Sequence, residues 1–266
     1  MNKNRNSSIG DLNCCQKSEL QKKEWGIMTK KQPDHGRRIL YEDQDLLVCV
    51  KPAGIAAQTK KSGQQDMVSL LRNYRHANGE EPYIGLVHRL DQPVEGILVF
   101  GKHAGSTAAL SRQLTQGNFA KGYLAVAQGT MPAREGKLVD FLKKDGRANC
   151  SYVVGEKEPG AKRAELLYQV LETDASLHPA RNLVKIQLLT GRHHQIRAQM
   201  AHVGTPLAGD CKYGIQSEAA GCCQEGLGLC AFELVFVHPV LKKKMKFEIT
   251  PSQPVFQKFA AVQISH

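Results

Sequence analysis

Short apolar segments of strand length, several of them ended by Gly or Pro, are the feature of this sequence that most limits its fold. Val184, Ile186 and Leu188 alternate with Lys185 and Gln187, and such a period of two is typical of a strand with one buried face. The other segments of this kind are 39–41, 46–50, 96–102, 120–129, "AELLYQVLET", "LCAFELVFVHP" and "KKKMKFEITP". The last two predict a closing hairpin, and together the segments predict a protein dominated by β-sheet.

Two segments have the apolar spacing of short helices. In the first, Ala108, Leu110 and Leu114 predict a helix that ends near Gly117. Residues 130–163, which follow the next strand segment, are expected to be rich in turns.

The second helix is predicted between Gly191 and Gly204. Ile196, Met200 and Val203 stand there at i, i+4 and i+7, which forms one apolar stripe on a helix. The pattern as a whole predicts one α+β domain with a mixed, mostly antiparallel β-sheet flanked by helices and loops.

Charge divides the chain into two parts and indicates a polyanionic partner. The 266 residues contain 36 Lys and Arg against 25 Asp and Glu, a net charge of +11. Residues 1–37 are polar and basic, and we expect them to form a disordered N-terminal extension ahead of a single domain over 38–266. The excess of positive charge extends into that domain, which favours nucleic acid as the partner.

Several other classes of protein are excluded. No segment approaches the roughly 18 apolar residues of a membrane span, and no apolar secretory core is present, so we expect a cytoplasmic protein that binds no membrane. The eight cysteines contain no C-x-x-C motif. A site formed by Cys211, Cys222, Cys223 and Cys230 would match none of the usual zinc spacings, so we expect reduced thiols and no metal or other cofactor. We also expect a monomer.

The stretch "VHRLDQPVEG" places Asp91 close behind His88 and Arg89. By itself, an acid after a strand is most often a turn former. An aspartate with basic neighbours is also a candidate nucleophile or base that is kept ionised by its surroundings.

Two further motifs give this aspartate a context. "AKGYLAV" contains Tyr123, and "LLTGRHHQIRAQMAHVGTPLAGDCKYG" contains Arg197. The adjacent His193 and His194 do not suggest metal binding, because neighbouring helical residues point about 100° apart. Taken singly, Tyr123 is typical of a strand core and Arg197 of a solvated helix flank.

Together and in this order, these motifs resemble those of the RluA-type pseudouridine synthases. That family has an H-R-L-D motif followed about a hundred residues later by T-G-R-x-H-Q-I/L-R, and this chain has both, at 88–91 and 190–197. The resemblance covers roughly residues 38–258. It implies a pseudouridine-synthase-type fold and an RNA uridine isomerase that needs no cofactor, acting on uridines of tRNA or rRNA.

The resemblance also implies roles for individual residues. Asp91 would be the catalytic carboxylate and Arg197 its ion-pair partner, while Tyr123 would stack on the extruded uracil. Arg89 would stabilise the flipped-out state of the RNA, and Ile196 would pack on the other side of the base. His88, His194 and Gln195 are expected beside the site or at phosphates.

The residues also suggest some phosphate contacts. Lys51, Lys102, Arg192 and Lys212 each stand beside a motif, which makes them candidates to bind phosphate. The run 242–244, three lysines, is instead expected to be a solvated hairpin tip.

Some departures from the family pattern leave the RNA target open. Gln92-Pro93 follows Asp91 where Thr-Ser is frequent, His193 replaces a common threonine, and Cys230 a common histidine. An RNA-binding protein of the same fold without catalysis is the alternative. A phosphotransferase is disfavoured, because Leu90 interrupts the kinase H-R-D motif and no glycine-rich phosphate loop is present. The sequence does not choose between attack on C1′ and proton abstraction at C2′.

Overall fold

The computed structural model describes residues 38–61, 63–214 and 225–263. Its strands are β1 (Arg38–Glu42), β2 (Leu46–Lys51), β3 (Gly85–Leu86), β4 (Glu95–Gly101), β5 (Ala120–Gln128), β6 (Glu135–Asp145), β7 (Cys150–Val154), β8 (Lys162–Asp174), β9 (Arg181–Leu188), β10 (Leu229–Val237) and β11 (Lys244–Glu248). Its helices are α2 (Met67–Ala77), α3 (Ala104–Thr115), α4 (Gln195–His202), the 3₁₀ helix η2 (Pro254–Phe256) and α5 (Ala260–Gln263). The predicted extension over 1–37 lies outside the described residues.

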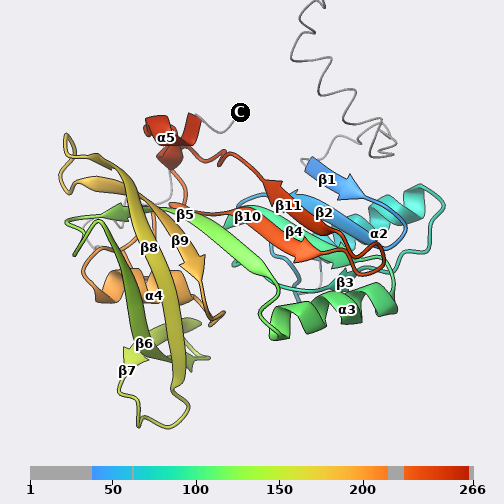
Figure 1. Ribbon diagram of the computed structural model, residues 1–266, viewed down its shortest axis with the longest axis horizontal. Helices are drawn as coiled ribbons and strands as arrows, with labels where there is room; N and C mark the ends of the chain where they lie inside the picture. Colours follow the sequence, from blue (N-terminus) through green and yellow to red (C-terminus); the bar gives the residue numbers. More distant parts are fainter. Residues whose placement is uncertain (1–37, 62, 215–224, 264–266) are drawn as a thin grey trace, which may run out of the picture. The chain divides into compact units, whose positions relative to one another are not determined.

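All of these strands join one sheet, in the order β1-β2-β4-β10-β5-β9-β8-β6-β7, with β11 paired to β10 and β3 to β4. Strand β10 pairs with β4 in parallel, and the other described pairs are antiparallel. The long strands β6 and β8 lie at one end of the sheet and β1 and β2 at the other (Figure 1). The predicted α+β class with a mixed, mostly antiparallel sheet is confirmed.

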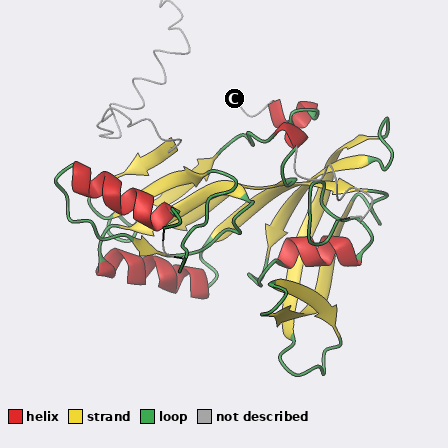
Figure 2. Cartoon of the chain, turned by 180° about the vertical axis from the view of Figure 1, so that it is seen from behind, coloured by secondary structure: helices red, strands yellow, loops and turns green. Residues whose placement is uncertain are grey.

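The sheet has a hydrophobic core on each face. Helices α2 and α4 pack on the same face, whose core includes Leu47, Leu71, Phe100, Ile186, Ile196 and Met200. Both helices lie toward the viewer in Figure 2. The opposite core combines alternate residues of the same strands with α3, η2 and α5, and includes Leu46, Val48, Val99, Leu110, Phe256 and Phe259. Because side chains alternate along each strand, these two cores account for the continuous burial of β2 and β4.

The sequence analysis did not predict helix α2. Its first turn has a capping box, in which the Asp66 carboxylate accepts from the Ser69 backbone N–H at 2.7 Å and the Ser69 side chain accepts from the Asp66 N–H at 3.1 Å. This arrangement satisfies two backbone donors that a helix start leaves unpaired. The helix buries Met67 and Leu71 against the sheet.

The prediction of a turn-rich segment over 130–163 was wrong. Most of it forms a long antiparallel hairpin of β6 and β7, which pairs with β8. Every second residue of β6 near its start is exposed, including Lys137 and the apolar Val139. The apolar signal of these strands is therefore weak, although their backbone pairing is regular.

At Gly96 the parallel strands β4 and β10 approach too closely for a side chain. A Cβ atom added there would lie 2.4 Å from the Cβ of Ala231 and 2.7 Å from its carbonyl oxygen. The residue also has φ of +154°, which L side chains rarely adopt. Glycine is thus required at this position, five residues after Asp91.

Candidate active site

All nine residues predicted for the site line one pocket of about 390 Å³. They are His88, Arg89, Asp91, Tyr123, Arg192, His194, Gln195, Ile196 and Arg197. These nine residues come from the loop between β3 and β4, from β5, and from the segment that leads from β9 into the first turn of α4, so the fold brings together motifs about a hundred residues apart.

The loop that carries Asp91 is held by a neighbouring loop through backbone groups. The Nζ atom of Lys51 donates to the carbonyl oxygens of Pro52 at 2.9 Å, Ile55 at 2.7 Å and Gln92 at 3.0 Å. Gly54 and Gln92 exchange two further hydrogen bonds, both of 2.9 Å. Asp91 therefore stands on a loop whose conformation is fixed by several contacts.

Lys51 is fully buried, so its ammonium is committed to the protein. Burial lowers the pKa of Lys51 to about 8, although the nearby carboxylates of Asp91 and Glu95 act in the opposite direction. Lys102 is also committed, because its Nζ atom lies 2.8 Å from Glu42 and 2.9 Å from Glu80. These contacts correct the prediction that Lys51 and Lys102 bind phosphate.

The start of α4 is positioned by Gln195. Its side-chain oxygen accepts from the Thr190 hydroxyl and the Arg192 backbone N–H, both at 2.9 Å, and its amide nitrogen donates to the Glu165 carbonyl at 3.0 Å. His194 precedes the helix in a left-handed conformation with φ of 50°. With its polar atoms used in this way, Gln195 shapes the turn, and its predicted contact with substrate stays a prediction.

Arg197 bridges two carboxylates. Its Nε and Nη2 atoms donate to Asp210 at 2.7 and 2.6 Å, while its Nη1 atom lies 3.6 Å from the carboxylate of Asp91. The side chain of Asp210 is 0% exposed and that of Arg197 5%, against 30% for Asp91. The bidentate pair fixes the guanidinium, and its remaining nitrogen faces the carboxylate that borders the pocket.

Asp210 is a residue of the site that the sequence analysis missed. It belongs to the quoted stretch "AHVGTPLAGDCKYG", but nothing in its neighbourhood along the chain indicates a partner at 197. In the structure its carboxylate also accepts the backbone N–H groups of Lys212 and Tyr213, at 2.9 and 3.2 Å. An acid in a G-D turn is ordinarily assigned to the turn alone.

Two opposing effects act on the ionisation of Asp91. Burial raises the pKa of its carboxyl, and the positive charge of Arg197 is the largest effect that lowers it. Lys51 adds a smaller effect in the same direction. The outcome is a carboxyl whose pKa is raised above its ordinary value but which has a fixed cation beside it.

His194 lies against the same pair and is neutral near pH 7. Its Nε2 atom is 3.5 Å from the Asp91 carboxylate, and its Nδ1 atom is 3.0 Å from the Tyr213 hydroxyl. Burial, followed by the charge of Arg197, lowers the pKa of His194 to about 3. A neutral imidazole here leaves Arg197 as the nearest cation to the acid.

Tyr123 and Ile196 form apolar walls of the pocket. Their residues are only 6% and 5% exposed. Burial, followed by the charge of Asp91, raises the pKa of Tyr123, so its hydroxyl stays protonated. An aromatic ring and an aliphatic side chain beside a carboxylate are suited to hold a flat base near an acid.

His88 is buried beside the pocket, where its ring packs edge-on against Phe119, with 5.3 Å between the ring centroids. Burial, followed by the charge of Lys121, lowers the pKa of His88 to about 3. Its Nδ1 atom has no hydrogen-bond partner among the residues that the structure describes. Arg89 and Arg192, in contrast, are exposed at the pocket. Lys212 is exposed and donates to the Asn149 carbonyl at 2.8 Å.

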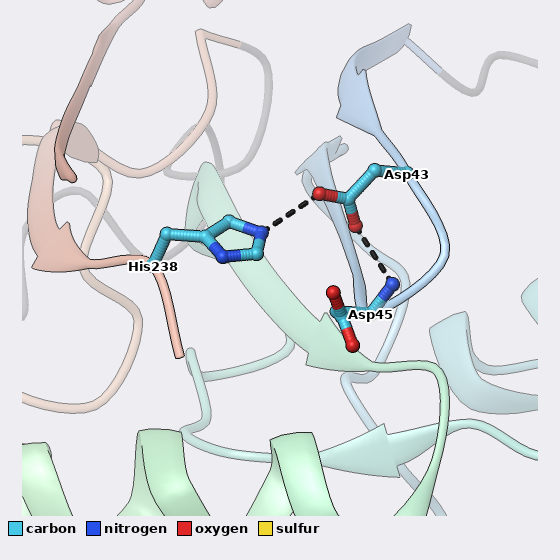
Figure 3. A group of neighbouring side chains, drawn as sticks. All are labelled: Asp43, Asp45 and His238. Carbon is cyan, nitrogen blue, oxygen red and sulfur yellow. Dashed lines mark hydrogen bonds and ion pairs between the residues drawn. The ribbon is translucent and has the colours of Figure 1, made fainter. Parts of the chain in front are cut away.

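One group outside the pocket has the composition of a metal site. Asp43, Asp45 and His238 place one ligand atom each within 4.8 Å of one another. Figure 3 shows the ring of His238 directed at the carboxylate of Asp43, with which its Nε2 atom makes a 2.7 Å contact.

Both nitrogens of His238 are nevertheless used by the protein. Its Nδ1 atom accepts the backbone N–H groups of Val240 and Leu241, at 3.2 and 3.0 Å, so Nε2 carries the proton and donates it to Asp43. The Asp43 carboxylate also accepts from the backbone N–H groups of Asp45 and Leu46. We interpret the group as a tie between the β1–β2 turn and the β10–β11 turn.

In the described part of the chain, no helix is both long and apolar enough to cross a bilayer.

Comparisons with known proteins agree with this geometry. The family model described as RNA pseudouridylate synthase matches residues 45–202, which include Asp91, Tyr123 and Arg197. An uncharacterized RNA pseudouridine synthase of Bacillus subtilis, YhcT, is 35% identical over 184 residues, which are 68% of this chain and 59% of that protein. The ribosomal large subunit pseudouridine synthase C of Haemophilus ducreyi is 32% identical over 229 residues, 84% of this chain and 69% of that protein.

A solved structure has the same fold. The human RNA pseudouridylate synthase domain containing 1 superposes with a TM-score of 0.67 at 22% identity, covering 83% of this chain and 86% of that one. The chain spans 59% and 65% of the length of two of its curated relatives, those from Bacillus subtilis and Mycoplasma pneumoniae. From the matched family model, the curated relatives and the shared fold, the chain belongs to the RNA pseudouridylate synthase family, as a member of RluA type.

Proposed function

We propose that this protein is an RNA pseudouridine synthase in which Asp91 is the catalytic carboxylate. The observation that carries the proposal is the placement of a partly exposed carboxylate in a pocket, 3.6 Å from a buried guanidinium and beside the ring of Tyr123. Isomerisation needs the N1–C1′ bond of uridine to break and a C5–C1′ bond to form, while C5 loses a proton and N1 gains one. It consumes no oxidant, reductant or co-substrate, so a positioned acid and a base-holding pocket are the required parts.

In this scheme the target uridine leaves its stack and enters the pocket between Tyr123 and Ile196. Extruding a nucleotide costs a few kcal/mol, and stacking on an aromatic ring contributes about 1–3 kcal/mol per base. Arg89, exposed at the pocket, is in a position to occupy or stack beside the vacated space.

Asp91 then acts on the sugar, either by attack on C1′ or by removal of a proton at C2′. Both routes begin from the ionised carboxylate, and both are favoured by the fixed guanidinium of Arg197. His194, which is neutral, and Tyr123, which stays protonated, add no charge that would compete with this pair.

We propose large-subunit ribosomal RNA as the first substrate to test, with transfer RNA as the second. The names of two relatives, the ribosomal large subunit pseudouridine synthases C and D, support this order. The net charge of +11 is consistent with either RNA.

The test is a map of pseudouridines in total RNA from cells with and without the gene, complemented with wild type, Asp91→Asn or Glu156→Gln. Glu156 is an exposed acid outside the pocket, so its variant should restore every site that wild type restores. Asp91→Asn should restore none, while its affinity for RNA stays within a few fold of wild type.

Pseudouridine formation by Asp91→Asn would reject this residue as the catalytic group. If wild type itself forms no pseudouridine but binds RNA, the chain is an RNA-binding protein of the same fold.

A further inference from the structure

Lys121 lies in the wall of the catalytic pocket. It stands on β5 two residues before Tyr123, so the two side chains leave the strand on the same face. Both line the pocket together with Asp91. Lys121 is partly buried, whereas Arg89 and Arg192 are exposed.

The charges of the pocket are unbalanced. Among the described residues of its lining, Asp91 is the single carboxylate, against four side chains with a permanent or ordinary positive charge: Arg89, Lys121, Arg192 and Arg197. Asp210 neutralises Arg197 through two hydrogen bonds. Among the residues that the structure describes, the other three form no ion pair with a carboxylate.

Of these three cations, Lys121 is the one withdrawn from solvent. Burial lowers its pKa, and no carboxylate in the described part of the chain counteracts this effect. Two other buried lysines of this protein do have partners. The ammonium of Lys51 donates to three backbone carbonyls, and that of Lys102 lies beside two carboxylates. A partly buried ammonium without a counter-ion is unfavourable unless an anion binds to it.

We propose that Lys121 is a binding site for a backbone phosphate of the RNA, next to the nucleotide that enters the pocket. The phosphodiester is the group of a nucleotide that carries a full negative charge, so it is the part of the substrate able to neutralise an ammonium. Lysine serves in such sites as a point charge that does not require the planar geometry of arginine. The inference rests on the proposed function, because it assumes that the pocket receives RNA.

The test compares two probes in proteins that carry Asp91→Asn, so that binding is measured without turnover. One probe is a uridine trinucleotide with natural phosphodiester linkages, and the other is the same trinucleotide with neutral methylphosphonate linkages. Their dissociation constants are measured by titration for the parent, for Lys121→Met, for Lys121→Arg and for Lys244→Met. Lys244 is an exposed lysine outside the pocket and serves as the control for loss of one charge.

Lys121→Met should weaken binding of the natural trinucleotide about tenfold, the loss expected for one charge-assisted phosphate contact. It should leave binding of the neutral trinucleotide unchanged. Lys121→Arg should recover most of the affinity, and Lys244→Met should bind both probes like the parent. On transcribed large-subunit ribosomal RNA, Lys121→Met should also reduce the slope of log affinity against log salt by about 1.

Equal losses for both probes would show that Lys121 contacts the base or sugar, and this would overturn the proposal. So would an unchanged affinity in Lys121→Met, or a parent that does not prefer the natural linkage. Thermal unfolding of Lys121→Met checks its fold, and no loss is expected because the ammonium has no carboxylate partner to leave behind.

The readout is separate from that of the proposed function. If the binding difference appears but no pseudouridine is formed in cells, the phosphate site holds and the activity is rejected. If pseudouridine is formed but the difference is absent, the activity holds and the phosphate site is rejected.

Discussion

Lys51 and Lys121 both lie near the loop that carries Asp91 and have opposite surroundings. The ammonium of Lys51 is fully buried and donates to three backbone carbonyls, one of them in the residue that follows Asp91. Lys121 lines the pocket, and no carboxylate in the described chain pairs with its ammonium. The first charge is consumed in holding the loop, while the second remains for a ligand.

Arginines of the site divide in the same way. Arg197 is held by Asp210 in the interior, whereas Arg89 and Arg192 are exposed at the pocket. Charges in the interior of the site are therefore held by partners within the protein, whereas the exposed charges at the pocket have no carboxylate partner among the described residues. The first kind should affect stability when removed, and the second should affect RNA binding.

The largest loss of stability is expected for Asp210→Ala. This change leaves the guanidinium of Arg197 buried without its main partner, and breaking a buried pair in this way costs about 3–5 kcal/mol of unfolding free energy. Urea unfolding followed by circular dichroism measures the loss. The matched control is Asp91→Ala, which removes the looser, 3.6 Å partner of the same arginine and should cost much less. Similar losses in the two variants would contradict the assignment of Asp210 as the main partner.

A smaller loss of unfolding free energy is expected for Lys51→Met, which keeps an aliphatic side chain but removes the ammonium. The carbonyls of Pro52 and Ile55 lose their donor, whereas that of Gln92 keeps the Gly54 N–H. Unsatisfied buried acceptors cost about 1–3 kcal/mol. Lys121→Met, measured in the same unfolding experiment, should change the free energy by less than about 0.5 kcal/mol. If the two lysine variants are equally stable, the contrast between these sites is wrong.

The smallest effect concerns pH and sharpens the role of Arg197, which Asp210 holds in the interior but which also lines the pocket beside Asp91. Because we propose that Asp91 acts as an ionised carboxylate, we expect kcat/KM to fall as pH falls through its raised pKa. Arg197→Gln removes the largest effect that lowers this pKa, and the acidic limb should therefore move to higher pH. Arg197→Lys keeps a positive charge and should move the limb less. Arg192→Gln is the control, and a limb that stays in place in Arg197→Gln would show that another group sets it.

Much of the fold was predictable because the local spacing of apolar residues indicates strands and helices. The strands near 46–50, 96–102 and 120–129 were each buried apolar runs, and the helix ending near Gly117 had a regular apolar spacing. The β6–β7 hairpin was not predicted, since both faces of β6 mix exposed and partly buried residues and leave no clear alternation of apolar side chains. Helix α2 was overlooked although Asp66 and Ser69 form a capping box that the sequence contains.

The site divides along similar lines. The nine residues predicted for the site line one pocket, because ordered motifs identified them, while their roles stay predictions. Two interactions could not be predicted from the sequence, because they form only when distant segments fold together. They are the ion pair of Arg197 with Asp210 and the hydrogen bond of Lys51 to the loop after Asp91. Lys121 stands within the quoted motif "AKGYLAV", but its lack of a carboxylate partner is a property of the folded pocket.

The close approach of β4 and β10 at Gly96 has a consequence for redesigning this protein toward other RNA targets. Since no side chain fits between Gly96 and Ala231, the half of the molecule that delivers Asp91 allows little variation at this point. The β6–β7 hairpin, at the far end of the sheet, is joined to the rest by regular pairing with β8 and carries basic residues such as Lys143 and Arg147 near its tip. Ser151 of β7 contacts both His193 and Tyr213, which border the site. We therefore expect changes confined to the exposed tip of the hairpin to be tolerated better than changes at Gly96.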